Sequence, residues 1–174
     1  MIDPDAAALA FDAEFLGRAP HLGIAPETPL HRPALRDLMI ACTPLRDLLP
    51  EALLDLQFAS QDDSFRASRP HAMRRVVTQE GVPIARIIID WQAPGISHGV
   101  DIAVHPDHRS SGAALAMLRA WITVADASGF VCTLDVIATN PAKRIYQRLG
   151  FVTQPGEPDA PYNVMVRQPR VRTH

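Results

Sequence analysis

A strand-like segment that enters a helix through a turn of small residues is the feature that most constrains how this chain can fold. Residues 98–104, HGVDIAV, alternate as a half-buried strand does, which places every second side chain from His98 to Val104 on one face. From Ala113 onwards, apolar residues recur at the spacing of an amphipathic helix. Between them stands RSSGAA, residues 109–114. Small side chains leave the backbone of this segment accessible. That is expected of a tight turn without a function and also of an anion-binding loop.

An anion-binding loop at this position would use the properties of a helix N-terminus. The first N–H groups of a helix lack intrahelical partners, and the helix dipole puts partial positive charge beside them. Small residues at Ser111, Gly112, Ala113 and Ala114 would let a phosphate approach these groups, and Arg109 would add a charged, forked donor. The chain contains neither G-x-x-x-x-G-K-[ST] nor G-x-G-x-x-G, so other phosphate motifs are not supported. Taken alone, the segment also fits a plain helix cap with a surface arginine.

The remaining pattern predicts an α/β fold, a mixed sheet with helices on both faces. Prolines break up residues 1–30, which we expect to form an N-terminal extension with a short helix, docked on a single domain of residues 31–174. Within that domain the sequence predicts, in order, two helices between Leu35 and Asp63, a hairpin of residues 73–91 with its turn at Glu80-Gly81, the strand 98–104, a helix from Ala113 to near Gly129, the strand 131–137, a helix from Asn140-Pro141 to Gly150, and two short strands.

The composition excludes several classes of function. With 174 residues, 47% of them hydrophobic and 21% charged, and a net charge of -2, the chain has the profile of one soluble globular domain. It lacks the basic surface of a nucleic-acid-binding protein or a polybasic membrane anchor. No apolar stretch approaches the roughly 18 residues of a membrane span, and the acidic N-terminus is unlike a secretory signal. Two cysteines in no metal-binding spacing, Cys42 and Cys132, favour the reducing cytoplasm.

A second segment gives the small-residue turn a role. NPAKRIYQRLGF, residues 140–151, lies about a helix and a strand downstream. Together the two segments resemble the GNAT superfamily of acyl-CoA-dependent N-acetyltransferases, whose pyrophosphate loop reads [Q/R]-x-x-G-x-[G/A] and whose later helix carries Asn-x-Ala-x-x-x-Tyr before Gly-Phe. The loop pattern falls here on Arg109, Ser110, Ser111, Gly112, Ala113 and Ala114.

The resemblance extends upstream of these motifs. LLDLQFASQDDSF and VVTQEGVPIARI are similar to segments of a bacterial subset of the family, so the resemblance runs from about residue 30 onwards. Two alanines depart from the usual pattern: Ala113 stands where a larger residue is common, and Ala85 where the hairpin often has glycine.

The resemblance implies a GNAT fold, in which the sheet splays between its fourth and fifth strands, here HGVDIAV and VCTLDVI. It also implies acetyl-CoA as the co-substrate, with the pantetheine arm paired along Ile102, Ala103 and Val104 and a hydrogen bond from Asn140. Backbone N–H groups of the fourth strand would stabilise the oxyanion that develops when a primary amine attacks the thioester directly.

Two side chains are candidates for the proton transfers. The resemblance puts Tyr146 at the position of a general acid, where a phenol with a pKa of about 10 could protonate the departing thiolate; otherwise it is a core tyrosine. His98, with an ordinary pKa near 6.5, is a candidate base, although a surface histidine or a water chain without a single base fits as well. Asp101 is expected on the opposite face of its strand in a structural role, unless a β-bulge re-aims it.

The resemblance also implies that the first two helices of the domain form one wall of the acceptor groove. Gln57 and Gln61, one helical turn apart, either contact the acceptor or cap nearby backbone. His105 and His108 form only a His-x-x-His pair, so no metal is expected. The acceptor would be a small-molecule or peptide amine, and the resemblance allows a homodimer. The alternative is a GNAT-like module that binds an acyl-CoA or a partner without transferase activity.

Overall fold

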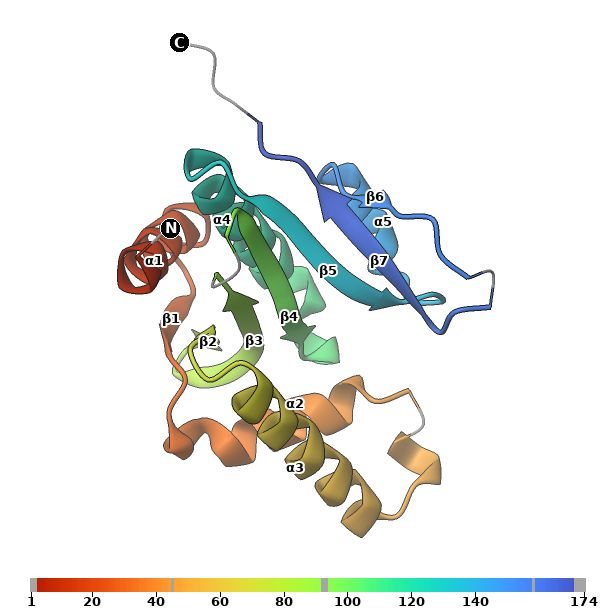
Figure 1. The fold of residues 1–174 in the computed structure, drawn as a ribbon. Helices are drawn as coiled ribbons and strands as arrows, with labels where there is room; N and C mark the ends of the chain where they lie inside the picture. The colour runs from red at the N-terminus through yellow and green to blue at the C-terminus, as the bar shows by residue number, and fades with distance from the viewer. Residues whose placement is uncertain (1–2, 45, 92–93, 158, 171–174) are drawn as a thin grey trace.

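Seven strands form one mixed sheet in the structure, a computed structural model that describes residues 3–44, 46–91, 94–157 and 159–170. The strands are β1 (Gly23–Pro26), β2 (Met73–Gln79), β3 (Val82–Asp90), β4 (Ile96–Val104), β5 (Val131–Ile137), β6 (Val152–Thr153) and β7 (Tyr162–Arg167). Their order in the sheet is β1-β2-β3-β4-β5-β7-β6 (Figure 1). The central neighbours β4 and β5 run parallel, whereas the other described pairs are antiparallel.

Helices cover both faces of this sheet (Figure 1). They are α1 (Pro4–Arg18), α2 (Arg32–Cys42), α3 (Glu51–Ser68), α4 (Ala113–Ala127) and α5 (Lys143–Arg148), with 3-10 turns at Pro29–His31, Arg46–Leu48 and Pro106–Ser111. The helices α1 and α4 pack together in the main hydrophobic core, whereas α2 and α3 lie against the other face beside β3 and β4. The predicted mixed α/β fold is confirmed.

Turn residues set most of the element boundaries. The hairpin between β2 and β3 turns at Glu80 and Gly81, whose φ angles of 52° and 82° are both left-handed, as in the tight turns that suit the twist of a hairpin. The helices α4 and α5 are each followed closely by a left-handed glycine, Gly129 and Gly150. The hairpin turn and the ends of both helices lie where the sequence predicted them, whereas α5 begins at Lys143 rather than at Asn140-Pro141.

The N-terminal segment takes part in the core. Asp3 caps α1 by accepting a hydrogen bond from the Asp5 N–H (3.0 Å), and Phe11 and Phe15 on the apolar edge of α1 are fully buried in the core that includes α4. The sequence did not predict β1, which pairs with β2 at the edge of the sheet. A strand of four residues with a glycine and a terminal proline has no alternation to detect, and an edge strand tolerates the proline. The domain boundary at residue 30 stays a prediction, and the chain on both sides of it packs into one core.

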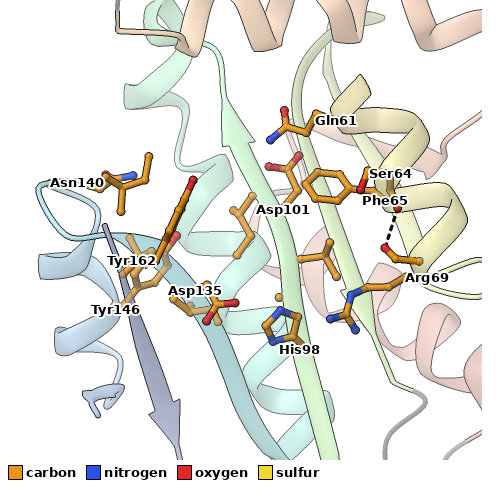
Figure 2. A pocket seen from close by; sticks show the side chains of 17 residues that line it. Gln61, Ser64, Phe65, Arg69, His98, Asp101, Asp135, Asn140, Tyr146 and Tyr162 are labelled. Carbon is orange, nitrogen blue, oxygen red and sulfur yellow. Dashed lines mark hydrogen bonds between the residues drawn. The ribbon is translucent and has the colours of Figure 1, made fainter. Parts of the chain in front are cut away.

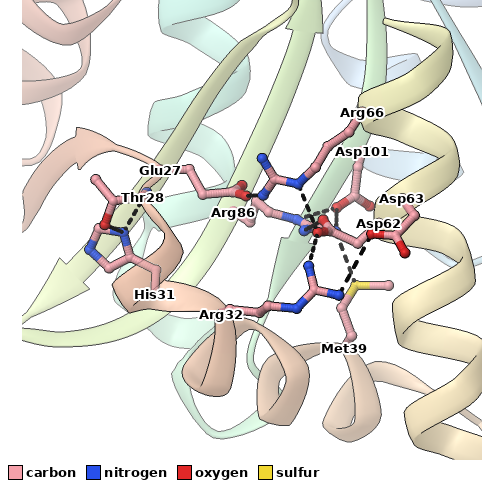
Figure 3. Close-up of polar contacts among 10 residues, drawn as sticks. All are labelled: Glu27, Thr28, His31, Arg32, Met39, Asp62, Asp63, Arg66, Arg86 and Asp101. Carbon is pink, nitrogen blue, oxygen red and sulfur yellow. Dashed lines mark hydrogen bonds and ion pairs between the residues drawn. The ribbon is translucent and has the colours of Figure 1, made fainter. Parts of the chain in front are cut away.

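A cluster of buried ions joins α2 and α3 to the sheet (Figure 3). Asp62 of α3 is 1% exposed and accepts hydrogen bonds from three arginines, Arg32 of α2 (3.0 Å), Arg66 of α3 (3.0 Å) and Arg86 of β3 (2.9 Å). Arg86 is fully buried and also binds Asp101 of β4 at 2.8 Å. These five residues, the Asp62 cluster, tie two helices to two neighbouring strands.

Charge pairing keeps Asp62 ionised inside the protein. Burial by itself raises the pKa of this carboxyl, but the hydrogen bond from Arg66 and the positive charges of the surrounding arginines outweigh burial and hold the pKa below its ordinary value. Arg86 in turn depends on its carboxylate partners, because a guanidinium with no exposed surface and no counter-charge would be strongly destabilising.

Replacement of Arg86 by leucine tests this dependence. In R86L, Asp62 and Asp101 lose their shared partner, so we expect the free energy of unfolding, measured by urea denaturation, to fall by about 3 kcal/mol. Arg36 is the matched control, since it also pairs with three carboxylates but lies at the surface, and R36L should leave the denaturation midpoint nearly unchanged. Small and equal effects of the two substitutions would contradict the structural role of the cluster.

Candidate active site

The strands β4 and β5 pair only over their first halves. The parallel register joins Ile96–Gly99 to Val131–Leu134, and the two strands then separate. The paired half of β4 is held against α4, because Trp121 Nε1 donates to Ser97 Oγ (2.9 Å). A Cβ on Gly99 would lie 2.8 Å from the Trp121 ring, so only glycine permits this packing. The predicted splay between the fourth and fifth strands is confirmed, and the second half of β4 has no described strand partner on the β5 side.

An extra residue in β4 interrupts its regular alternation. In the antiparallel ladder with β3, Gly99 lies opposite Ile89, but Asp101 lies opposite Ile88. Val100 therefore has no partner in this ladder, which is the arrangement of a β-bulge. A bulge of one residue turns every later side chain of the strand to the opposite face.

The bulge changes which residues share a face with His98. The prediction that His98 lies on the same face as Ile102 and Val104 is wrong, since these two side chains pack against the core that contains α4, on the far side of the sheet. His98 instead lies on the same side as Asp101, facing α3 (Figure 2). The shared face for His98, Ile102 and Val104 assumed unbroken alternation. For Asp101 the register agrees with the stated exception, in which a β-bulge re-aims this side chain.

A cavity of about 740 Å³ opens where β4 and β5 separate (Figure 2). Side chains from α3 form one wall, the two strands form its floor, and α5 and the start of β7 form the other wall. The lining residues are Gln61, Ser64, Phe65, Ser68, Arg69, His98, Gly99, Val100, Asp101, Ile102, Leu134, Asp135, Val136, Ile137, Asn140, Tyr146 and Tyr162.

Tyr146 reaches this cavity from α5, on the α4 side of the sheet. Its ring is 8% exposed and packs edge-on against Phe151, with the ring centroids 5.9 Å apart. Burial, and next the nearby negative charge of Asp101, raises the pKa of the Tyr146 hydroxyl to about 12. The phenol therefore keeps its proton at neutral pH and is a proton donor in the cavity.

His98 lies on the opposite side of the same cavity. Its Nδ1 is 2.9 Å from Thr133 Oγ1 on β5, so Nε2 is the ring nitrogen left for a ligand. Burial lowers the pKa of His98, and the positive charge of Arg69 lowers it further, while Asp135 and Asp90 oppose the shift. The ring is consequently neutral at pH 7 and can accept a proton.

The α3 wall contains one of the two predicted acceptor-contacting glutamines. Gln61 lines the cavity, whereas Gln57, one turn earlier, is exposed and does not. Sequence reasoning missed Arg69, Asp135 and Tyr162, which also line it. One signal for Asp135 was present, because it is the only charged residue in the otherwise apolar or neutral strand VCTLDVI.

The small-residue loop ends in a backbone conformation that suits glycine. Gly112 has a φ of 83° and precedes the first turn of α4, and a Cβ added to it would meet no atom within 4 Å, so the approach to this helix end is open. The Ser111 hydroxyl accepts a hydrogen bond from the Ala113 N–H (3.3 Å), so this N–H is already engaged rather than free. His21 contacts the Ser111 carbonyl oxygen through Nε2 at 3.1 Å, which braces the loop from the N-terminal segment. Arg109 is exposed beside it.

The remaining predicted cofactor residues lie along the splay and the loop. Asn140 lines the cavity, but its Oδ1 accepts a hydrogen bond from the Ala142 N–H (2.9 Å), which leaves the side-chain NH2 group as the donor for a ligand. The other five occupy the second half of β4 and the loop before and into α4: Ile102, Ala103, Val104, Ser110 and Ala114.

The two loop histidines are engaged with other parts of the protein. His105 Nδ1 accepts a hydrogen bond from the Asp107 N–H (3.3 Å), and His108 Nδ1 lies 3.1 Å from Gln79 Oε1. Within the described ranges, no three His, Cys, Asp or Glu side chains are grouped as a metal site would require. The helices that the structure describes include none with the length and apolar character needed to cross a membrane.

A mixed sheet that opens between its two parallel central strands, with a cavity at the opening, defines a domain of the α/β class with a site at the splay. The sequence profile of the acetyltransferase (GNAT) family matches residues 33–151, more than half of the chain. The chain belongs to this family.

Solved structures share the fold at low sequence identity. The PaiA N-acetyltransferase of Thermoplasma acidophilum, solved in complex with coenzyme A, superimposes with a TM-score of 0.66 at 12% identity, over 84% of this chain and 98% of that one. The ribosomal-protein-S18-alanine N-acetyltransferase of Escherichia coli gives a TM-score of 0.58 at 22% identity, over 83% and 90% of the two chains. An acetyltransferase of Streptococcus agalactiae gives 0.62 at 16%, over 85% and 98%. No curated protein sequence matches this chain.

The ionisation of His98 can be measured directly. An NMR titration of the ring should give a pKa below 6.5, because burial and Arg69 disfavour the charged form. In R69Q the pKa should rise, since the repelling charge is gone and Asp90, which pairs with Arg69 at 2.5 Å, favours protonation of His98. The exposed Arg46 provides the control variant R46Q, which should leave the titration unchanged. A pKa at or above 6.5 in the wild type would contradict the site electrostatics.

Proposed function

We propose that the protein transfers an acetyl group from acetyl-CoA to a primary amine by direct attack. The observation that carries the proposal is the approach of Tyr146 and His98 to one cavity from opposite sides of the splay between β4 and β5. Family membership supports the class of reaction, and the two side chains supply the proton transfers that such a reaction requires.

The residues of the loop and the splay fit an acyl-CoA. The open helix end at Gly112 and the exposed guanidinium of Arg109 suit a pyrophosphate, and the splayed half of β4 has backbone groups for an extended pantetheine arm. In an antiparallel ladder, alternate N–H groups point away from the partner strand, so between Ile102 and Val104 some point into the splay rather than towards β3. They would stabilise the oxyanion, and Asn140 would bind the same ligand from the other side. Acetyl-CoA supplies the thioester that the amine attacks.

The proposed reaction balances through two side chains. The amine nitrogen forms a bond to the acetyl carbonyl carbon, the C–S bond breaks, and the amine proton passes to His98 directly or through water. Tyr146 gives its proton to the departing thiolate, and solvent restores both groups. The raised pKa keeps Tyr146 protonated at neutral pH, so the phenol is present as the acid when the C–S bond breaks.

Substitution of the proposed acid tests the mechanism. In Y146F the thiolate departs without a positioned proton, so kcat for thiol release should fall by about a hundredfold or more. Tyr162 is the matched control, since it lines the same cavity but is 58% exposed, and Y162F should retain kcat within a few fold. An unchanged kcat in Y146F would show that Tyr146 is not the acid.

Binding of the donor is tested separately by thermal unfolding. A hundredfold excess of acetyl-CoA over its Kd should raise the midpoint by about 8 °C, and nicotinamide dinucleotides should not raise it. R109Q should weaken this stabilisation, whereas R119Q, which removes an exposed arginine from α4, should not. No shift at millimolar acetyl-CoA would contradict the donor assignment. Stabilisation without thiol release for any amine would favour the alternative of a binding module.

The cellular compartment, the source and the oligomeric state of the protein are also part of this proposal. Cys42 and Cys132 are both free thiols, which fits a reducing compartment, and we place the enzyme in the cytoplasm. A bacterial origin and a homodimer stay predictions. The acceptor belongs to the broad class of small-molecule or peptide amines. The charges and apolar side chains around the cavity are the basis for a narrower choice among these amines.

A further inference from the structure

We propose that Asp135, with the apolar sheet face beside it, binds the acceptor and selects a primary alkylammonium ion that carries an apolar body. The inference rests on the proposed function, in that it takes the cavity between β4 and β5 as the acceptor site. Its argument comes from the charges, the strand register and the exposure of this part of the protein.

The charged side chains that line the cavity differ in whether they are already paired. Asp101 is bound by Arg86 at 2.8 Å, and Arg69 is bound by Asp90 at 2.5 Å. Asp135 is exposed on β5 and forms no ion pair with any residue that the structure describes. The cavity thus offers one carboxylate whose charge is not already neutralised by the protein, and a cationic ligand complements it.

The position of Asp135 places this charge beside the proposed base. Thr133, two residues earlier and on the same face of β5, holds His98 through the contact of 2.9 Å. The charge of Asp135 also acts on His98, where it favours the protonated ring. An ammonium group bound by Asp135 would therefore sit next to His98, which can accept its first proton and pass it to solvent. The neutral amine then attacks, and its second proton leaves through His98 as in the proposed reaction.

An apolar strip continues outward from Asp135 on the same face of the sheet. In the ladder between β5 and β7, Asp135 is paired with Val164 and Ile137 is paired with Tyr162. These neighbours are large and exposed: Ile137 by 47%, Tyr162 by 58% and Val164 by 48%. Since Ile137 and Tyr162 also line the cavity, the strip and the cavity form one continuous surface.

Charge and apolar surface together define the ligand. A carboxylate at the inner end of the strip would bind the ammonium group, while the hydrocarbon body would cover side chains that water now contacts. Apolar surroundings also strengthen the ion pair by lowering the local dielectric. An amine whose body carries an acidic group would place a negative charge near Asp135, so such acceptors should be rejected.

The experiment compares straight-chain primary amines from butylamine to octylamine. Binding to the protein with coenzyme A in place of acetyl-CoA is measured by calorimetry, and KM is measured with acetyl-CoA. Each added methylene should tighten binding by about fourfold until the strip is covered. D135N should weaken binding and raise KM for hexylamine at least tenfold. It should also lower the apparent pKa of the acidic limb of kcat/KM, because the charge that favours protonated His98 is gone.

The matched control is D5N, which removes one negative charge from an exposed position at the start of α1 and should change none of these values. Hexanol has the same hydrocarbon body without the positive charge. It should bind to the wild type far more weakly than hexylamine does, whereas D135N should bind hexanol and hexylamine with equal affinity. Equal amine binding by the wild type and D135N would overturn the role of Asp135. Binding that does not change with chain length would overturn the role of the strip.

The failures of the two proposals can be told apart. Selective amine binding without thiol release would leave this inference standing and overturn the proposed transferase function. Amine-dependent thiol release that is the same in the wild type and in D135N would leave the proposed transferase function standing and overturn the role of Asp135. If sedimentation shows a dimer that V164E converts to monomers without any loss of amine binding, the strip is an interface between two copies, and its assignment to the acceptor is overturned.

Discussion

Asp62 of α3 accepts hydrogen bonds from three arginines, and one of them, the fully buried Arg86 of β3, also holds Asp101 of β4. Helix propensity and apolar contacts alone do not fix where α3 lies along the sheet. The directional ion pairs of the Asp62 cluster do so, because a misplaced helix would leave a guanidinium buried without its carboxylates. Gln61 is adjacent to Asp62 in α3, so the contact that fixes the helix also fixes the wall of the proposed acceptor cavity. Stability and site geometry therefore depend on the same charges.

The cavity itself results from two local departures from a regular sheet. The close packing of Gly99 against Trp121 holds the first half of β4 on α4, and β5 separates from β4 directly after that point. The bulge at Val100 then turns Asp101 to the side of His98. A strand without the bulge would have pointed Asp101 into the core that contains Ile102, where Arg86 could not neutralise it. One extra residue thus aligns the ion cluster, the proposed base and the open edge of β4.

Local patterns in the sequence were sufficient for most of the fold. Glycines and prolines marked the ends of α4, α5 and the hairpin, and apolar periodicity marked the elements between them, because these signals act over a few residues. The strand β1 escaped notice because its pairing with β2, rather than its own composition, makes it a strand. A bulge near Asp101 was allowed as an exception, but its position could not be predicted, since it exists only in the register with β3. At the site, Tyr146 and the loop were found by their resemblance to a family pattern, whereas Asp135 and Arg69 belong to no motif and gain their roles only from what the fold brings beside them.

The most direct test of the account is mass spectrometry of the products formed from acetyl-CoA and hexylamine. Direct transfer predicts N-acetylhexylamine in an amount equal to the thiol released, with no acetyl group left on the protein at any time during turnover. Thiol release without acetylated amine, or an acetylated protein that forms before the product, would contradict the proposal that the amine attacks the thioester within the cavity between β4 and β5.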